Sequence, residues 1–192
     1  LNADPKVFPD AVQIAELNYL DTIELAYSGA QIIHPKTIKP LQNKNIPLYV
    51  RPFGDKRKPG TVIRRMSAPI EVPILILKKD QVLLTIRSRD FSFVLEEKFA
   101  AIFSLLERYR IKVNLVHNSA VNLSLCVDNS WHIDEAIQAL RNEEFDVMKV
   151  ENMELLTIRG YNGDLMERYA SGPEVFLLQR TQSTARIVRK NR

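Results

Sequence analysis

The stretch IKVNLVHNSAVNLSLCV, residues 111–127, decides the fold of this chain. Ile111, Val113 and Leu115 alternate with polar residues, and the same period of two returns between Val121 and Val127. Successive side chains of a β-strand point to opposite faces of the sheet. The pattern therefore predicts two strands, each with one buried and one exposed face.

Apolar residues at helical spacing occur on both sides of these two strands. A helix that buries one stripe carries apolar residues three and four positions apart. Outer strands are predicted at 82–86 and 145–150, which completes the order β-α-β-β-α-β of a ferredoxin-like unit, with both helices on one face of an antiparallel sheet. The helical stripes are Leu95, Phe99, Ile102, Phe103 and Leu106 before the strands, and Ile133, Ala136, Ile137 and Leu140 after them.

A second unit of the same kind begins after the first. Strands are predicted at 155–158, 175–178 and 185–188, with a short helix at 164–169. This copy lacks its last helix and strand, and an incomplete sheet would expose an edge. The apolar run at 74–77 would supply the missing pairing, so we expect the first unit to be inserted within the second.

Residues before about 65 show a different pattern. Pro35 predicts the start of a short helix, which Pro40 should interrupt or bend. Strands are predicted at 46–50 and 61–63. These elements are too few to enclose a core of their own, as in a truncated domain. An earlier helix, with Asp21 near its start to cap it or to favour the helix dipole, is predicted from the spacing of Leu20, Ile23, Tyr27 and Ala30.

The overall composition limits the classes of function. The chain of 192 residues is 45% hydrophobic and 26% charged, with a formal charge of +4, so neither disorder nor a polyanion partner is expected. No apolar run reaches the roughly 20 residues that span a bilayer. The single Cys126 has apolar neighbours and is expected to be a buried thiol. A reducing, cytoplasmic location is predicted, and a start without Met suits a fragment.

Three segments of the first 65 residues resemble the aspartate kinase family: ADPK at 3–6, ELAYSGAQIIHPKT at 24–37 and GT at 60–61. The resemblance implies an α+β chain with four parts. These are the carboxy-terminal part of an α/β amino-acid kinase domain at 1–66, a linker and strand at 67–79, a first ACT unit at 80–151 and a second at 152–192. Tandem ACT units of the ferredoxin-like type, the first inserted in the second, are therefore expected.

The resemblance also implies a nucleotide site. Lys6 falls where the family has a basic residue on the ATP phosphates, and Gln31 and Ile32 fall at the next nucleotide contact. Phosphoryl transfer depends on positioning and charge neutralisation, which suits a lysine near a phosphate; the plain alternative is a solvated loop lysine. ATP with Mg²⁺ is the expected co-substrate of the parent enzyme. The aspartate-binding half of the kinase domain is absent, so no catalytic residue is assigned and the chain alone is expected to be inactive.

ACT units of this family resemble amino-acid sensors that pair in a homodimer. By this resemblance Val113, Asn114, Asn118 and Ser119 would contact an amino-acid effector. Ordinary solvent-facing polarity is an equal alternative for the two asparagines. The effector stays open among lysine, threonine, another amino acid or none, because three positions depart from the lysine-responsive pattern: Asn114 replaces an Asp, Glu97 a Gly and Ala120 a Glu.

Two rival functions remain. An RNA-binding module shares the β-α-β-β-α-β order, but it stacks bases on aromatic residues of the central strands, and residues 122–127 contain none. A stand-alone ACT sensor would have no use for the nucleotide-binding turn. His34, His117 and His132 have no second ligand at metal spacing, so no metal site is predicted. No nucleic-acid or membrane partner is predicted either.

Overall fold

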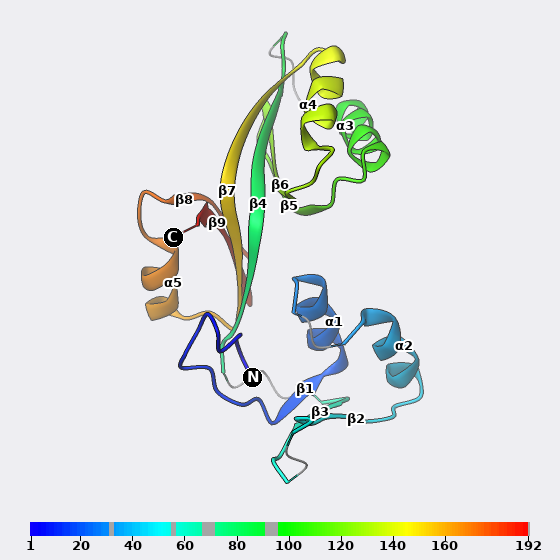
Figure 1. Ribbon diagram of the computed structural model, residues 1–192, viewed down its shortest axis with the longest axis vertical. Coiled ribbons are helices and arrows are strands. Elements are labelled where there is room, and N and C mark those ends of the chain that lie inside the picture. The colour runs from blue at the N-terminus through cyan, green and yellow to red at the C-terminus, as the bar shows by residue number, and fades with distance from the viewer. Residues whose placement is uncertain (31–32, 55–56, 67–71, 91–95, 192) are drawn as a thin grey trace. The chain divides into compact units, whose positions relative to one another are not determined.

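The computed structural model (Figure 1) describes residues 1–192 except 31–32, 55–56, 67–71, 91–95 and 192. The chain divides into two compact units, each of which is described by itself. None of the described helices is long and apolar enough to cross a bilayer. The first unit contains residues 1–77, 156–171 and 180–186, and the second contains residues 78–155, 172–179 and 187–192.

The first unit contains a three-stranded sheet in the order β1-β3-β2. Strand β3 (Thr61–Arg64) pairs in parallel with β1 (Glu16–Asn18) and antiparallel with β2 (Leu48–Val50). Helices α1 (Tyr19–Tyr27) and α2 (Pro35–Asn43) belong to the same unit. Their buried side chains join Ile74 and Ile76 of a later strand in one apolar cluster, so the early elements do share a core, but with help from residues beyond 65. The cluster consists of Ile14, Leu17, Tyr19, Leu25, Ile38, Ile63, Ile74 and Ile76.

Helix α1 forms where it was predicted, but only part of the predicted face packs against the core. Ile23 and Ala30 are partly buried against the apolar cluster, whereas Leu20 and Tyr27 are 63% and 62% exposed. Asn18, not Asp21, caps the helix: its side chain accepts a hydrogen bond from the Asp21 backbone N–H at 2.8 Å. The buried residues of α1 are Tyr19, Asp21, Thr22 and Leu25. Half of this face is polar, which hydrophobic periodicity cannot detect.

Helix α2 begins at Pro35 as predicted. His34 precedes it as the N-cap, and its Nδ1 accepts a hydrogen bond from the Lys36 backbone N–H at 3.2 Å. The expectation that Pro40 interrupts the helix is wrong, because α2 continues to Asn43 with Pro40 inside it. Proline lacks one backbone donor, but its φ is helical and the turn tolerates the loss here.

A six-stranded sheet in the order β5-β6-β4-β7-β9-β8 forms the other sheet of the described chain. The first four of these strands and two helices follow one another along the chain as β4, α3, β5, β6, α4 and β7, which confirms the predicted β-α-β-β-α-β order. The elements are β4 (Ile74–Ser88), α3 (Glu96–Arg108), β5 (Val113–Asn118), β6 (Asn122–Asp128), α4 (Ile133–Asn142), β7 (Phe145–Arg159), α5 (Gly163–Ala170), β8 (Val175–Arg180) and β9 (Thr184–Lys190).

Strands β4 and β7 are longer than the sequence predicts. The runs at 74–77 and 82–86 are one continuous strand of 15 residues, and β7 likewise joins 145–150 to 155–158. Between the two predicted runs of each strand lie Asp80 and Asn152, which have positive φ values of 55° and 58°. An isolated residue with this backbone can bend a strand without ending it, because the ladder on either side holds the pairing.

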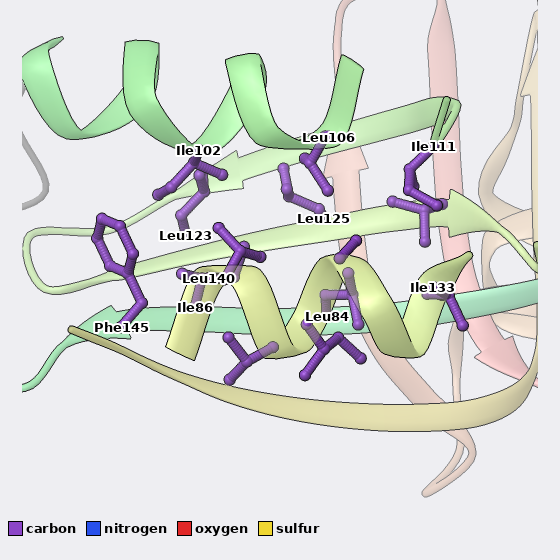
Figure 2. Close-up of a cluster of buried hydrophobic side chains, with 14 of the residues drawn as sticks. Leu84, Ile86, Ile102, Leu106, Ile111, Leu123, Leu125, Ile133, Leu140 and Phe145 are labelled. Carbon is purple, nitrogen blue, oxygen red and sulfur yellow. The ribbon is translucent and has the colours of Figure 1, made fainter. Parts of the chain in front are cut away.

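The core of the second unit lies between the helices α3 and α4 and one face of the sheet (Figure 2). Helix α4 buries Ile133, Ala136, Ile137 and Leu140, the four residues predicted from their spacing. Alternate residues of the strands point to the opposite face and form a second apolar cluster. This cluster consists of Leu83, Leu115, Cys126, Met153, Leu155, Leu177 and Val188. Both faces of the central strands are therefore covered.

Candidate functional site

The amino-terminal loop that carries Lys6 is held by a set of short-range hydrogen bonds. The Asp4 side chain accepts from the Lys6 backbone N–H at 2.9 Å, and the Asp4 carbonyl accepts from Val7 and Phe8 at 3.0 and 2.8 Å. Asn2 anchors the loop, because its side chain donates to the Pro73 carbonyl at 2.8 Å. The turn leaves Lys6 exposed, where its ammonium group can reach an anion from solvent.

A cavity of about 480 Å³ lies beside this loop. Asp4 and Pro5 line it from the loop, and Gly29 and Ala30 line it from the end of α1. Gly29 has φ 115°, a conformation that L side chains rarely adopt, and this lets the Ala30 N–H return to the Leu25 carbonyl at 2.9 Å. The rest of the lining is Leu1, Asn2, Ala3, Ile14, Leu17, Leu25, Val50, Thr61, Ile63 and residues 74–77.

The cavity thus brings together the two segments that the sequence assigns to a nucleotide. Its volume falls within the range of small-molecule sites, and most of its lining residues are apolar, with Asn2, Asp4 and Thr61 as the polar ones; Lys6 itself does not line it. Gln31 and Ile32 follow Ala30 directly but lie outside the described residues, so their role stays a prediction, as does that of Lys6.

An ion-pair cluster that the sequence did not predict fixes the start of α1. Arg159, at the end of β7, pairs with Asp21, and with Glu24 at 3.0 Å. It also donates to the Thr184 hydroxyl at 3.2 Å. The Asp21 side chain is only 9% exposed. The helix that leads to the cavity is therefore tied to residues more than 130 positions away, a separation at which sequence reading carries no signal.

The four residues predicted to contact an effector lie on or just after β5. Asn118 and Ser119 are exposed at the turn into β6, where the Ser119 N–H donates to the Asn122 carbonyl at 2.9 Å. Val113 and Asn114 are half-buried at the start of the strand, where the pairing with β6 shifts by one residue. The structure therefore separates the four into an exposed pair and a half-buried pair.

Asn114 belongs to a polar network on β4, β5 and β6. Its Nδ2 donates to Asp128 Oδ1 at 2.6 Å and to Gln81 Oε1 at 2.7 Å, and its Oδ1 accepts from Lys78 at 2.8 Å. Lys78 also pairs with Asp128 at 2.6 Å. The side chains of this network are bonded to one another rather than turned toward solvent.

Charge and burial set the acid–base behaviour of the network. Burial opposes ionisation of Asp128, but the hydrogen bonds from Lys78, Gln81 and Asn114 outweigh it, so the pKa of this carboxyl is lowered from 3.8. Burial raises the pKa of the neighbouring Cys126 thiol to about 12, and the negative Asp128 adds to the rise. The thiol is therefore protonated and unreactive at neutral pH, as its apolar surroundings predict.

Two further expectations concern the loop into α3 and metal binding. Residues 91–95 and the side chain of Glu97 lie outside the described part, so the predicted approach of an effector carboxylate there stays a prediction. Lys98 donates to the Ser88 hydroxyl at 2.6 Å beside this loop. Within the described residues, no group of three or more His, Cys, Asp or Glu side chains could hold a metal ion.

Comparison with known proteins agrees with this arrangement. The model of the amino acid kinase family matches residues 1–52. The lysine-sensitive aspartokinase 3 of Escherichia coli is 30% identical over 181 residues, which cover 90% of this chain and 40% of that protein. The structure of the aspartate kinase of Clostridium acetobutylicum aligns with a TM-score of 0.83 at 18% identity, over 99% of this chain and 48% of that one.

A shorter structure matches a smaller share of the chain. It is described as a putative carboxy-terminal regulatory domain of aspartate kinase from Porphyromonas gingivalis, and it matches 62% of this chain and 86% of its own length, with a TM-score of 0.52 and 20% identity. The first segment thus has the sequence of an amino acid kinase, and the fold as a whole is one that solved aspartate kinases share.

The predicted resemblance to the aspartate kinase family is confirmed, because the chain aligns with an aspartokinase over 90% of its length and shares the fold of solved aspartate kinases. The chain spans less than half the length of the Escherichia coli and Clostridium acetobutylicum enzymes, 40% and 48%.

Proposed function

We propose that this chain is the carboxy-terminal regulatory part of an aspartate kinase, which phosphorylates L-aspartate with ATP to 4-phospho-L-aspartate on the route to lysine, threonine and methionine. The observation that carries this proposal is the match to an aspartokinase over 90% of the chain. It is supported by the cavity that joins the two segments assigned to the nucleotide.

The α+β part is proposed to consist of two ACT units, the first inserted within the second. The sheet order supports this, because β4 lies between β6 and β7, and β7 in turn pairs with β9. One end of β4 and β7 would then belong to the sheet of the first ACT unit, and the other end to the sheet of the second ACT unit. The proposed parts are residues 1–66 for the kinase tail, 67–79 for the linker and strand, and 80–151 and 152–192 for the two ACT units.

In the nucleotide site, Lys6 is proposed to bind ATP phosphates, with Gln31 and Ile32 beside the nucleotide. ATP with Mg²⁺ would be the co-substrate of the longer enzyme. The only role that follows for the described residues is binding, since an exposed lysine on a rigid turn can neutralise phosphate charge but supplies no nucleophile. The chain alone is expected to release no ADP from ATP and aspartate in a coupled assay, and turnover by this polypeptide would contradict the assignment.

In the regulatory part, Val113, Asn114, Asn118 and Ser119 are proposed to bind an amino-acid effector in a homodimer of ACT units. The name of the Escherichia coli relative, lysine-sensitive, supports an amino acid as the class of effector. Calorimetric titration with lysine, threonine and methionine, with sedimentation analysis of the same samples, tests both parts. Saturable binding of one amino acid by a dimer is expected. A monomer that binds none would overturn the regulatory role.

The two rivals make different predictions. An RNA-binding module needs an exposed sheet face, but Leu83 and Cys126, on the face opposite the helices, are buried. Filter binding with single-stranded RNA is therefore expected to show no retention. A stand-alone ACT sensor in the cytoplasm would bind the amino acid equally well. It would leave Lys6 without a role, so a loss of nucleotide binding by Lys6→Ala distinguishes the two.

A further inference from the structure

The ammonium group of Lys78 occupies a position defined by two side-chain oxygens. Its Nζ lies 2.6 Å from Asp128 Oδ1 and 2.8 Å from Asn114 Oδ1. The side chain of Lys78 is 22% exposed and that of Asp128 is 33% exposed, so the position is partly covered but still open to solvent. Charge-assisted hydrogen bonds of this length are among the strong ones in proteins.

The Asp128 carboxylate, which accepts from Lys78, is also held by hydrogen bonds from two side-chain amides. Gln81, only 1% exposed, donates from Nε2 to Asp128 Oδ1 at 2.9 Å and to the carbonyls of Lys79 and Asp80 at 3.1 and 3.2 Å. Asn114 Nδ2 donates to the same Asp128 oxygen at 2.6 Å. The oxygen is thus also oriented by a buried amide, unlike a carboxylate on a mobile surface side chain.

The side-chain amide of Asn114 suits a site in which the Lys78 ammonium group is already present. The asparagine amide offers a donor to Asp128 and an acceptor to Lys78 at the same time. An aspartate at this position would place a second carboxylate oxygen about 2.6 Å from the first, and one ammonium group would have to neutralise both. Because the Asn114 amide is neutral, the single positive charge of Lys78 is enough to balance the negative charge of Asp128.

We propose that Lys78 is a tethered ammonium group that fills a cation subsite formed by Asp128, Asn114 and Gln81. It thereby determines which ligands can bind beside β5, since no ligand can place its own ammonium group on Asp128 Oδ1 while Lys78 is there. The consequence for the effector rests on the proposed regulatory function, but the subsite itself stands on the geometry alone. Removal of the Lys78 side chain is expected to open a site for a primary alkylammonium ion.

Chemical rescue tests this directly. In Lys78→Ala, n-propylammonium supplies the three missing carbons and the nitrogen. At a concentration about ten times its dissociation constant, it should raise the midpoint of thermal unfolding by about 3 °C over sodium chloride of equal ionic strength. Tetramethylammonium has no N–H donor and should give no such rise. Wild type should not respond, because its subsite is filled, and Lys78→Ala/Asp128→Asn should not respond, because its subsite lacks the charge.

Lys149 provides a matched control. Its side chain is as covered as that of Lys78, at 21% exposed, and it lies 2.7 Å from Asp134 and 2.6 Å from Glu151. These carboxylates, however, are 79% and 57% exposed. Lys149→Ala should therefore show no rescue by n-propylammonium. An equal response in both variants, or in wild type, would mean that the amine acts nonspecifically and would overturn the proposal.

If Lys78→Ala does not fold without the amine, the yield of refolded protein with and without n-propylammonium gives the same comparison, and an amine-independent yield would again overturn it. Titration of wild type with amino acids keeps this result separate from the proposed function. Amino-acid binding without rescue of Lys78→Ala removes the tethered ammonium and leaves the regulatory role. Rescue of Lys78→Ala without amino-acid binding to any variant supports the tethered ammonium and removes the regulatory role.

Discussion

Helices α4 and α1 were both predicted from apolar spacing, but only α4 buries the residues that the spacing names. The buried face of α4 is Ile133, Ala136, Ile137 and Leu140, all apolar and all predicted. The face that α1 buries includes Asp21 and Thr22, whereas Leu20 is mostly exposed. Periodicity identifies a helix in both cases, but it identifies the core side only where burial is apolar.

The reason for the difference lies in what each helix packs against. Helix α4 covers a sheet face of aliphatic side chains, so the hydrophobic effect selects its apolar stripe. Helix α1 meets Arg159, whose charge requires a carboxylate if it is to be covered. Burial of Asp21 is a response to a distant arginine, and nothing within α1 itself indicates it.

The largest expected effect is the loss of a buried leucine on α4. Leu140 is fully buried, so Leu140→Ala should lower the free energy of unfolding by about 2–5 kcal/mol through lost burial and a residual cavity. Leu20→Ala on α1 is the matched control and should change it by less than about 0.5 kcal/mol. Urea denaturation followed by circular dichroism measures both. Equal costs would show that Leu20 is part of a core after all.

A smaller but still large effect is expected for Asp21. Asp21→Ala leaves Arg159 without its most buried partner and should cost about 2 kcal/mol. Asp134 occupies the first turn of α4 and pairs with Lys149 at 2.7 Å, but its side chain is 79% exposed, so Asp134→Ala should cost under about 1 kcal/mol.

Because both aspartates lie in the first turn of a helix, their contributions to the helix dipole are similar and largely cancel in the comparison. The same denaturation experiment in 1 M salt should reduce the cost for Asp134 more than that for Asp21, since exposed pairs are screened more strongly. If the two aspartates cost the same, the polar face of α1 contributes nothing specific.

The N-caps of the two helices should differ by a smaller amount. The Asn18 side chain accepts from the Asp21 N–H at 2.8 Å, so Asn18→Ala should cost about 1 kcal/mol. His132 precedes α4 without a side-chain capping bond, and His132→Ala should be close to neutral. Thermal unfolding midpoints distinguish the two, and a neutral Asn18→Ala would mean that the buried face alone holds α1.

The smallest effect expected is a pH dependence from Asp128, another polar group covered by tertiary contacts. Because its pKa is lowered in the folded state, it contributes stability above about pH 4, and this is lost as pH falls through the folded pKa. Asp128→Asn should therefore flatten the decline of unfolding free energy below pH 4. An unchanged decline, measured by urea denaturation at several pH values, would show that other carboxylates account for it.

In the candidate sites, too, the sequence indicated some features and only the structure shows others. The sequence located the loop with Lys6 and the end of α1, and the structure places these two segments around one cavity. It also pointed to Asn114 as an effector contact, which stays a prediction; the structure adds that its amide is bonded to Gln81 and Asp128. Lys78 carried no signal of its own, because its partners lie 36 and 50 positions further along the chain.

The sequence alone determined the order of helices and strands from β4 to β7, the apolar face of α4, the buried state of Cys126 and the resemblance to aspartate kinases. These properties depend on local periodicity or on short motifs that can be read along the chain. Only the tertiary structure decided that β4 and β7 are continuous, that Asp21 is buried and that Lys78 reaches Asp128. Each of these results from pairing between residues distant in sequence, where the energy of a charge or a ladder bond depends on a partner that no local pattern specifies.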